Sequence, residues 1–366
     1  MSSTDPHTAP DNFRHRVREA LTEFLAVQRE RVEPMGAEAL RLVDEAAELL
    51  AGGKRLRAAF CEAGFAAAGG NPEDPAVQPA LARACAALEI LHASALVHDD
   101  LMDDSATRRG RPTTHLAFRR IHHEEGWPAG RQSDARRYGE AAAILLGDLM
   151  LSWADELLRT SGFPADRVLS ALAVLDQCRS EVIVGQFLDV SVQARGRADV
   201  ETAMTVVRYK SAKYSVERPL HVGAALAGAD EGMMRTLTDY GLPLGEAFQL
   251  RDDLLGVFGD PEVTGKPAGD DLVQGKRTVL VALTLDNASG QEASLLDHSL
   301  GTDLDGAGIA RLRDIIEESG AKAQVEAAIE LLTERALHAL EKADTIPATA
   351  IEHLRVLAAA ATKRAR

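Results

Sequence analysis

Cysteines, aromatic residues and long apolar runs are all scarce in this chain of 366 residues. The three cysteines, Cys61, Cys85 and Cys178, are odd in number and far apart, so neither a disulfide framework nor a zinc site is indicated. No run approaches about eighteen apolar residues, and the first residues, MSSTDPHTAP, contain no apolar segment. We therefore expect no secretion signal, no stable membrane insertion and a reducing, cytoplasmic location.

Positive charge is also in deficit. The chain carries 41 Lys and Arg against 56 Asp and Glu, giving a net charge of −15. This balance argues against nucleic acid as a partner, because proteins that bind it usually present a basic face. Aromatic residues make up 4% of the chain, while alanine and leucine are abundant and period-two alternation is rare. These features predict an all-α protein.

Apolar residues recur at helical spacing through most of the chain, from about Phe13 onward. The clearest helical blocks are 79–104, 139–160, 166–192, 200–227, 231–258, 276–286 and 307–363. Polar, glycine-containing loops are expected at 122–139 and 259–278. We predict a flexible tail at 1–12 and one large helical domain over 13–366.

Four aspartates follow an apolar stretch in LVHDDLMDDSATRRGRPTTH, residues 96–115. On a helix, Asp99 and Asp103 differ by about 40° and share a face, with Asp100 beside them. Such carboxylates repel one another, and oxygen ligands alone favour a hard cation such as Mg²⁺. His92 lies two turns earlier on the same stripe. The alternatives are a charged helix end in water and an ordinary interior histidine.

A second acidic pair, Asp252 and Asp253, lies in FQLRDDLLGVFGD, one turn after Gln249. If the two acidic helices face each other, their carboxylates can hold several Mg²⁺ ions and, through them, a diphosphate. Basic residues beside glycines or on apolar helices are candidates for further phosphate contacts, although charge runs often only solvate a surface. They are Lys54, Arg55, Arg57, Arg108, Arg109, Arg111, Lys210, Lys213, Lys266 and Lys276.

These motifs, in this order, resemble those of the trans-isoprenyl diphosphate synthases, the polyprenyl synthetase family, over about residues 20 to 340. GGKRLRA resembles GGKRLRP of the family, and HDDLMDDSATRRGRPT resembles DDxxD followed by RRGxPT. GQFLDV, YKSAKYS and FQLRDDLLGVFGDPEVTGKPAGDDLVQGKRT resemble the GQxxD element, the KTA element and the second aspartate-rich motif with its lysine loop. The resemblance implies a helical bundle of the isoprenoid synthase type with a central apolar cavity.

The resemblance also implies roles for individual residues. Three Mg²⁺ ions would be bound by Asp99, Asp100, Asp103 and Asp252. The allylic diphosphate would be contacted by Arg108, Lys210, Lys266 and Lys276. Isopentenyl diphosphate would be held by Gly53, Lys54, Arg57, His92 and Arg109. The remaining site residues would be Gln186, Asp189, Ser211 and Gln249. A homodimer and condensation through ionisation of the allylic diphosphate are likewise implied, with Lys210 and Gln249 acting beside the aspartates in catalysis.

Two features leave the product open. Position 256 is glycine where the second motif of the family usually has a third aspartate, and Asp260 would substitute for it if the helix continued. Ser94 and Ala95, just before Asp99, are small where shorter-product members tend to have an aromatic residue, which favours geranylgeranyl diphosphate. Longer products, farnesyl diphosphate, a class I terpene cyclase and a noncatalytic subunit are the alternatives.

Overall fold

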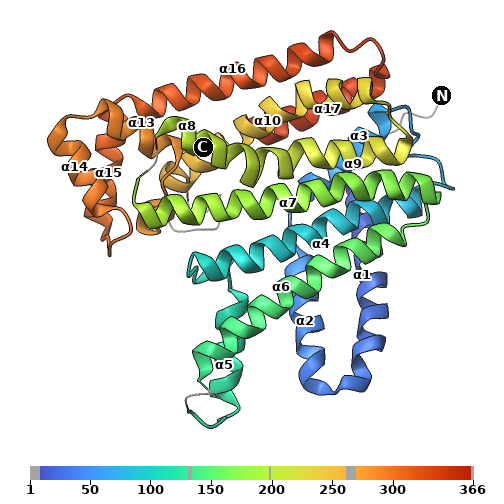
Figure 1. Cartoon of the computed structure of the whole chain (residues 1–366), viewed down its shortest axis with the longest axis horizontal. Coiled ribbons are helices and arrows are strands. Elements are labelled where there is room, and N and C mark those ends of the chain that lie inside the picture. The colour runs from blue at the N-terminus through green and yellow to red at the C-terminus, as the bar shows by residue number, and fades with distance from the viewer. Residues whose placement is uncertain (1–8, 131–133, 198, 261–268, 364–366) are drawn as a thin grey trace. The chain divides into compact units, whose positions relative to one another are not determined.

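The computed structural model describes residues 9–130, 134–197, 199–260 and 269–363, and helices dominate this part of the chain (Figure 1). The strands in it are β1 (Thr107–Arg108) and β2 (Arg111–Pro112), which pair antiparallel. The predicted all-α class is therefore confirmed. The first helix begins at Ala9, so it starts within the segment 1–12 that was predicted to be a tail.

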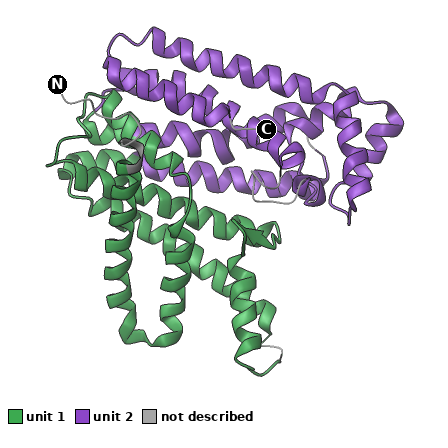
Figure 2. Cartoon of the chain, turned by 180° about the vertical axis from the view of Figure 1, so that it is seen from behind, with its two compact units in different colours: residues 1–173, 222–228 green, residues 174–221, 229–366 purple. Residues whose placement is uncertain are grey.

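The chain divides into two compact units, coloured separately in Figure 2. Unit 1 comprises the residues up to Ala173 together with Val222–Gly228. Unit 2 comprises Val174–His221 and the residues from Ala229 onward. Helices α7 (Ala165–Arg195) and α9 (Arg218–Ala227) each contribute residues to both units. The expectation of a single domain over 13–366 stays a prediction.

Unit 1 is assembled around one apolar helix, α4. Its elements before α7 are α1 (Ala9–Val32), η1 (Glu33–Met35), α2 (Ala37–Ala51), α3 (Leu56–Ala67), α4 (Gln78–Met102), β1, β2, α5 (Thr114–Glu124) and α6 (Ala135–Arg159). Helix α4 packs against α6, α1 and α3. In length and composition α4 is the one described helix that could cross a membrane, but 72% of its apolar window is buried within the protein. This burial is typical of a core helix.

Helices α4 and α6 approach closely at Gly147. The Ser94 hydroxyl donates a 2.7 Å hydrogen bond to the Gly147 carbonyl. A side chain at position 147 would lie 2.1 Å from Nε2 of His98, so any larger residue there would displace the imidazole. The face of α4 that carries Ser94 and His98 is therefore turned toward α6.

Glu62 on α3 should make the stability of the protein depend on pH. Burial raises its pKa to about 7, although Arg16 lies 3.2 Å away and lowers it. Because the folded-state pKa exceeds the ordinary value, Glu62 favours the folded protein at low pH and loses this contribution as pH rises from 4.5 to about 7. The unfolding free energy of the Glu62→Gln variant should fall less over this range than that of the wild type, by about 3 kcal/mol.

Urea unfolding at a series of pH values checks this prediction. Glu73→Gln is the matched control, because Glu73 also pairs with Arg16 but its side chain is 70% exposed. Identical pH profiles for wild type and Glu62→Gln would contradict it.

Unit 2 is built around α10. Its elements after α7 are α8 (Val200–Val206), η2 (Val207–Glu217), the first residues of α9, α10 (Glu231–Phe258), α12 (Asp270–Val273), α13 (Val279–Asn287), α14 (Gly290–Ser299), α15 (Gly306–Glu318), α16 (Ala321–Glu341) and α17 (Ala348–Thr362). Helix α10 packs against η2 and α16. A side chain at Gly245 would lie 2.4 Å from the Ala212 carbonyl, so α10 and η2 meet at their backbones.

Two predicted helical blocks differ from the structure in detail. Residues 200–227 are helical throughout, but the eleven residues of η2 form a π-helix. The block 307–363 is divided into α15, α16 and α17, because Gly320 adopts a left-handed conformation with φ of 77° and Pro347 precedes α17. Helices α5 and α6 also extend into the predicted loop 122–139, and the Asp134 side chain caps α6.

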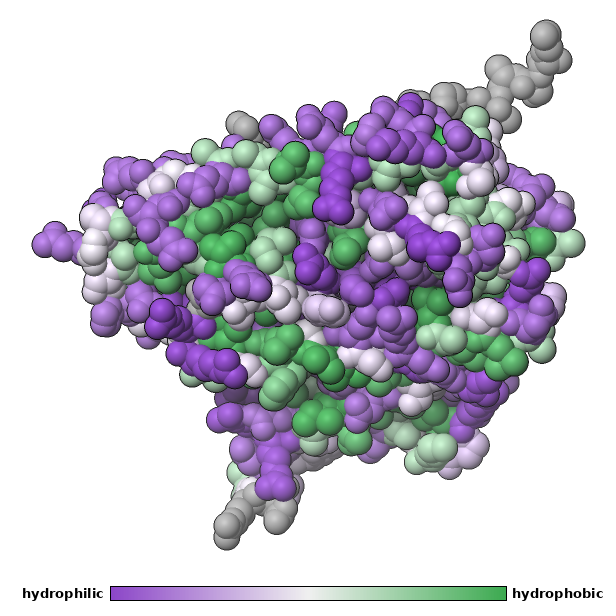
Figure 3. Space-filling model, turned by 45° about the horizontal axis from the view of Figure 1, so that its top comes forward, coloured by the Kyte–Doolittle hydropathy of each residue, from purple (hydrophilic) through white to green (hydrophobic). Residues whose placement is uncertain are grey.

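Apolar residues interrupt the hydrophilic surface in patches on the face seen in Figure 3. Among the described residues, several large exposed apolar side chains lie on α7. Ile183 is 56% exposed and Phe187 is 69% exposed, and both lie on one face of the helix. A helix face of this kind is typical of an interface with another molecule.

Candidate active site

The first acidic motif lies at the C-terminal end of α4 in unit 1. Asp99 and Asp100 occupy the last turn, and Asp103 is the residue that caps it. Asp100 is buried and accepts hydrogen bonds of 3.0 and 3.1 Å from Nε of Arg108, which also lies 3.8 Å from Asp99. The helix therefore brings the three predicted aspartates to one end, where Arg108 neutralises part of their charge.

These carboxylates offer oxygen donors only. Mg²⁺ suits such donors and is commonly held by one or two carboxylates together with substrate phosphates. Among the described residues, no three carboxylate, imidazole or thiol groups are arranged to hold a metal ion by themselves. The residues thus fit a cation that completes its coordination with substrate oxygens, rather than one enclosed by protein.

The hairpin β1–β2 positions the arginines of the RRGRP motif. Its turn residues, Arg109 and Gly110, have φ values of 53° and 75°. This left-handed pair matches the twist of a two-residue hairpin, and Gly110 adopts it without steric cost. The Thr113 hydroxyl donates a 2.7 Å hydrogen bond to the Ser105 carbonyl and closes the loop.

The turn brings Arg109 against the glycines of the GGKRLRA motif. A side chain at Gly53, which has a φ of 113°, would lie 3.1 Å from the Arg109 guanidinium. Only glycine accommodates both this backbone conformation and this approach. Two basic motifs that lie about fifty residues apart in the sequence are thus neighbours in unit 1.

A cavity of about 300 Å³ opens beside this turn in unit 1. Its walls include Asp100, Arg108, Arg109 and His92. Burial, followed by the neighbouring Arg57 and Arg109, lowers the pKa of His92 well below its ordinary value. His92 is therefore neutral at pH 7. The cavity walls combine arginines with carboxylates, since Glu45, Glu48 and Glu89 also line it.

Not every predicted phosphate contact lines this cavity. Gly53, Lys54 and Arg57 lie outside its walls, although Gly52 is among them. Lys54 is exposed at the mouth of the GGKRLRA loop, and Arg57 is half-buried on α3. Their predicted contact with isopentenyl diphosphate stays a prediction.

Sequence reasoning missed the pair of Arg55 and Glu89. Arg55 is buried, has a left-handed φ of 55°, and donates a 3.2 Å hydrogen bond from Nη1 to Glu89. The other oxygen of Glu89 accepts a 3.2 Å hydrogen bond from the Ala58 amide at the start of α3. Glu89 therefore fixes the loop that carries Lys54. The sequence did contain a sign of this role, because Glu89 is a charged residue inside an apolar helix, one turn before His92.

The second acidic motif lies on α10 in unit 2. Asp253 is buried, and Nε2 of Gln249 donates a 2.8 Å hydrogen bond to its Oδ1. Burial, together with the charges of Asp271 and Asp252, raises the pKa of Asp253 to about 7, although the hydrogen bond from Gln249 lowers it. Gln249 thus holds Asp253 in place, while Asp252 is only half-buried and more accessible.

Asp271 fills the space beside Gly256. A side chain at position 256 would lie 1.8 Å from Oδ2 of Asp271, and Lys276 lies 3.5 Å from Oδ1 of the same carboxylate. Helix α10 ends at Phe258, so the condition under which Asp260 would substitute, a helix that continues to residue 260, is not met. The Asp271 carboxylate from α12 thus occupies the space that a side chain at position 256 would enter.

Lys210 and Asp189 form an ion pair of 2.6 Å between η2 and α7 in unit 2. Gln186 and Ser211 are half-buried on the same two elements. Lys266 lies outside the described residues. The prediction that the two acidic helices share one cavity concerns both units and stays a prediction.

Comparison with known proteins identifies the family. The model of the polyprenyl synthetase family matches residues 41–318. The short chain isoprenyl diphosphate synthase of Methanothermobacter thermautotrophicus is 32% identical over 83% of this chain and 85% of its own. The geranylfarnesyl diphosphate synthase of Aeropyrum pernix is 32% identical over 84% of this chain and 89% of its own.

A solved structure gives the same result. The geranylgeranyl pyrophosphate synthase of Corynebacterium glutamicum, complexed with isoprenyl diphosphate and magnesium, has a TM-score of 0.92 and 40% sequence identity, covering 97% of this chain and 99% of that one. This chain therefore belongs to the polyprenyl synthetase family and is a prenyltransferase of the isoprenyl diphosphate synthase kind.

Proposed function

We propose that the enzyme condenses isopentenyl diphosphate with an allylic diphosphate in a Mg²⁺-dependent reaction and makes geranylgeranyl diphosphate. One observation carries the proposal. Asp100 and Arg108 line the same cavity as His92 and Arg109, which supports a site in unit 1 where the first aspartate-rich motif lies beside the proposed contacts of a second diphosphate. A terpene cyclase, which uses a single diphosphate, has no need of these second contacts.

Each group of residues has a distinct task. Asp99, Asp100, Asp103 and Asp252 would hold three Mg²⁺ ions, which when bound neutralise the charge that develops on the departing diphosphate. Arg108 and Lys210, with Lys266 and Lys276, orient that diphosphate by charge-assisted hydrogen bonds. Gly53, Lys54, Arg57, His92 and Arg109 hold isopentenyl diphosphate so that its double bond meets the allylic cation. Gln249 and Lys210 present polar groups near that cation, and the released diphosphate accepts the proton.

Purified protein tests this proposal directly. It should be incubated with Mg²⁺, isopentenyl diphosphate and each of the C5, C10 and C15 allylic primers, and the products sized by mass spectrometry. A C20 product that disappears with EDTA is expected. A C15 or C25 product would correct the chain length only, whereas no condensation with any primer would favour a noncatalytic subunit and contradict the proposal.

Product length should depend on Ala95. Ala95 lies one turn before Asp99 on the same face of α4, and it is only half-buried. Ser94 is turned toward α6 by its hydrogen bond to Gly147, so a large residue there would disturb packing instead. The Ala95→Phe variant should therefore make mainly farnesyl diphosphate, measured by product sizing.

Ser94→Ala is the matched control for this prediction, because it removes the hydrogen bond to α6 without adding bulk. Its product should remain that of the wild type. If Ala95→Phe also keeps the wild-type product, the floor of the product site lies elsewhere.

We further propose a cytoplasmic homodimer. The exposed stripe of Ile183, Phe187 and Val190 on α7 is apolar enough to be covered by a second copy. Sedimentation equilibrium at micromolar concentration should give twice the mass of the chain, and Phe187→Glu should shift the protein toward the monomer. A wild-type protein that sediments as a monomer would contradict this assembly.

A further inference from the structure

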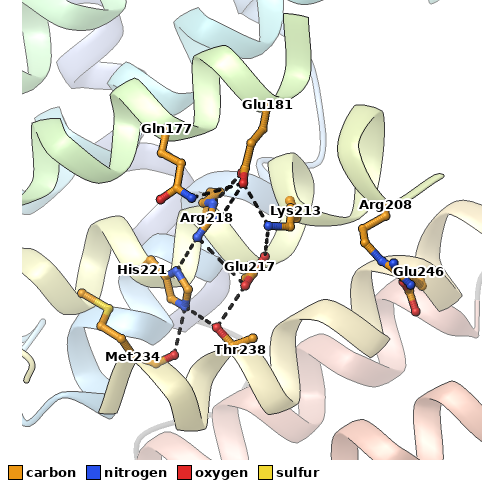
Figure 4. Close-up of polar contacts among 10 residues, drawn as sticks. All are labelled: Gln177, Glu181, Arg208, Lys213, Glu217, Arg218, His221, Met234, Thr238 and Glu246. Atoms are coloured by element: carbon orange, nitrogen blue, oxygen red, sulfur yellow. Dashed lines mark hydrogen bonds and ion pairs between the residues drawn. The ribbon is translucent and has the colours of Figure 1, made fainter. Parts of the chain in front are cut away.

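A buried ionic network joins α7 to η2 and α9 in unit 2 (Figure 4). Glu181 accepts two hydrogen bonds of 2.7 Å from Arg218, one from Nε and one from Nη2. Lys213 donates a third, of 2.9 Å, from Nζ. Burial alone would raise the pKa of Glu181, but the hydrogen bonds from Arg218 and Lys213 hold it below its ordinary value. Glu181 is therefore the anion on which two cations converge.

A second layer ties the network to α10. Arg218 donates a 3.1 Å hydrogen bond to Nδ1 of His221, which leaves Nε2 of the same ring to donate to the Met234 carbonyl at 3.1 Å. The Thr238 hydroxyl donates a 3.0 Å hydrogen bond to Glu217. Figure 4 shows Glu181 on one side of Arg218 and His221 and Glu217 on the other. The arginine is thus held in one orientation.

The network contacts η2, the π-helix of eleven residues. Extended π-helical geometry is rare and is found mostly at functional sites, so it needs support from its surroundings. Glu181, Gly185 and Asp189 are spaced four residues apart on one face of α7, and all three meet η2. A side chain at Gly185 would lie 2.4 Å from the Lys210 amide nitrogen, and Asp189 pairs with the Lys210 side chain at 2.6 Å.

We propose that Glu181 is a positioning residue whose ion pairs with Lys213 and Arg218 hold the π-helical turn against α7 and thereby place the Lys210 ammonium for the allylic diphosphate. The proposal rests on the proposed function, because it assigns Lys210 to that substrate. Without Glu181, Lys213 and Arg218 lose their hydrogen-bonded anion and share only Glu217, which lies 3.9 Å from Lys213 and 4.0 Å from Arg218. The wide turn can then relax toward ordinary helix, which rotates Lys210 away from Asp189.

A stabilising role alone does not account for this arrangement. Buried ion pairs are often no more stabilising than apolar residues of the same size, because removing both charges from water is costly. Buried ion pairs do, however, fix the orientation of the side chains that form them, which apolar contacts leave adjustable. The stripe on α7 runs from the ion pairs of Glu181 to the contact between Asp189 and Lys210. It therefore fixes the position of Lys210, the predicted substrate contact.

The Glu181→Gln variant tests the proposal, because it keeps the size of the side chain and removes its charge. Asp176→Asn is the matched control, since Asp176 lies on the same helix and forms an exposed pair with Arg179. For Glu181→Gln, we expect roughly a tenfold or greater loss in kcat/KM for the allylic primer. The KM for isopentenyl diphosphate should not change. Amide hydrogen exchange within residues 207–217 of the substrate-free protein should accelerate.

Lys213→Met provides a second variant, because it keeps the two hydrogen bonds between Arg218 and Glu181. Lys213→Met should also lower kcat/KM for the allylic primer and accelerate exchange in residues 207–217, but by a smaller factor. It replaces Glu181→Gln in the test if that variant does not fold. A folded variant with wild-type kinetic constants and wild-type exchange, whatever its melting temperature, overturns the proposal. Wild-type protein without turnover would contradict the proposed function. In that case, amide hydrogen exchange in η2, compared between wild type and Glu181→Gln, would still decide whether Glu181 holds the π-helical turn.

Discussion

Replacing Asp99 by asparagine should lower Mg²⁺-dependent condensation roughly a thousandfold. Asp99 lies in the last turn of α4, its side chain is 20% exposed, and Arg108 is 3.8 Å away. The amide keeps the shape of the carboxylate and removes the charge that attracts the cation. Initial rates at saturating substrates, measured across a Mg²⁺ titration, should show both a lower plateau and a higher Mg²⁺ requirement.

Asp104→Asn is the control for this variant. Asp104 belongs to the same acidic run, but its side chain is fully exposed and its φ of 48° is one that asparagine adopts readily. Its rate should stay close to that of the wild type. An Asp99→Asn enzyme as active as the Asp104→Asn enzyme would remove Asp99 from the metal site.

Restoring the usual third aspartate of the family, through Gly256→Asp, should lower activity rather than raise it, by roughly a hundredfold. The new side chain would enter the space that Asp271 already occupies, 1.8 Å from Oδ2 at its first atom. Asp271 would then be displaced together with Lys276, which lies 3.5 Å from it. The measurement is kcat/KM for the allylic primer at saturating Mg²⁺.

The double variant Gly256→Asp with Asp271→Gly makes this prediction specific. It exchanges the positions of the carboxylate and the glycine, so it should recover much of the activity lost in Gly256→Asp. If the single variant is more active than wild type, Asp271 does not take the place of the missing aspartate.

Residues that act within one helix could be placed from the sequence. Spacing alone put Asp99, Asp100 and Asp103 at one end of a helix and His92 two turns away, and the structure places them there. Helical periodicity also predicted most of the long helices. The relative positions of such residues depend only on the local geometry of the helix, which repeats every turn.

Contacts that depend on the path of the chain could not be placed. Arg55 and Glu89 are 34 residues apart, and Asp271 lies beside Gly256 only because α12 packs against α10. Ser94 and Ala95 are adjacent, yet only the packing of α6 determines that Ser94 is the one turned toward Gly147. The π-helix of η2 was missed because its wide turns depend on close packing against Gly185 of α7 and Gly245 of α10, which the local sequence does not show.

The order of synthesis matters for this chain, because unit 1 is not a continuous segment. Val222–Gly228 completes it, and Gly223 lies so close to the Cys61 carbonyl that a side chain there would be 1.8 Å away. As the nascent chain leaves the ribosome, α3 therefore waits for a strip of α9 that follows the first segment of unit 2, Val174–His221. The N-terminal helices cannot reach their final packing early, and exposed apolar surface on them is a natural target for chaperones during translation.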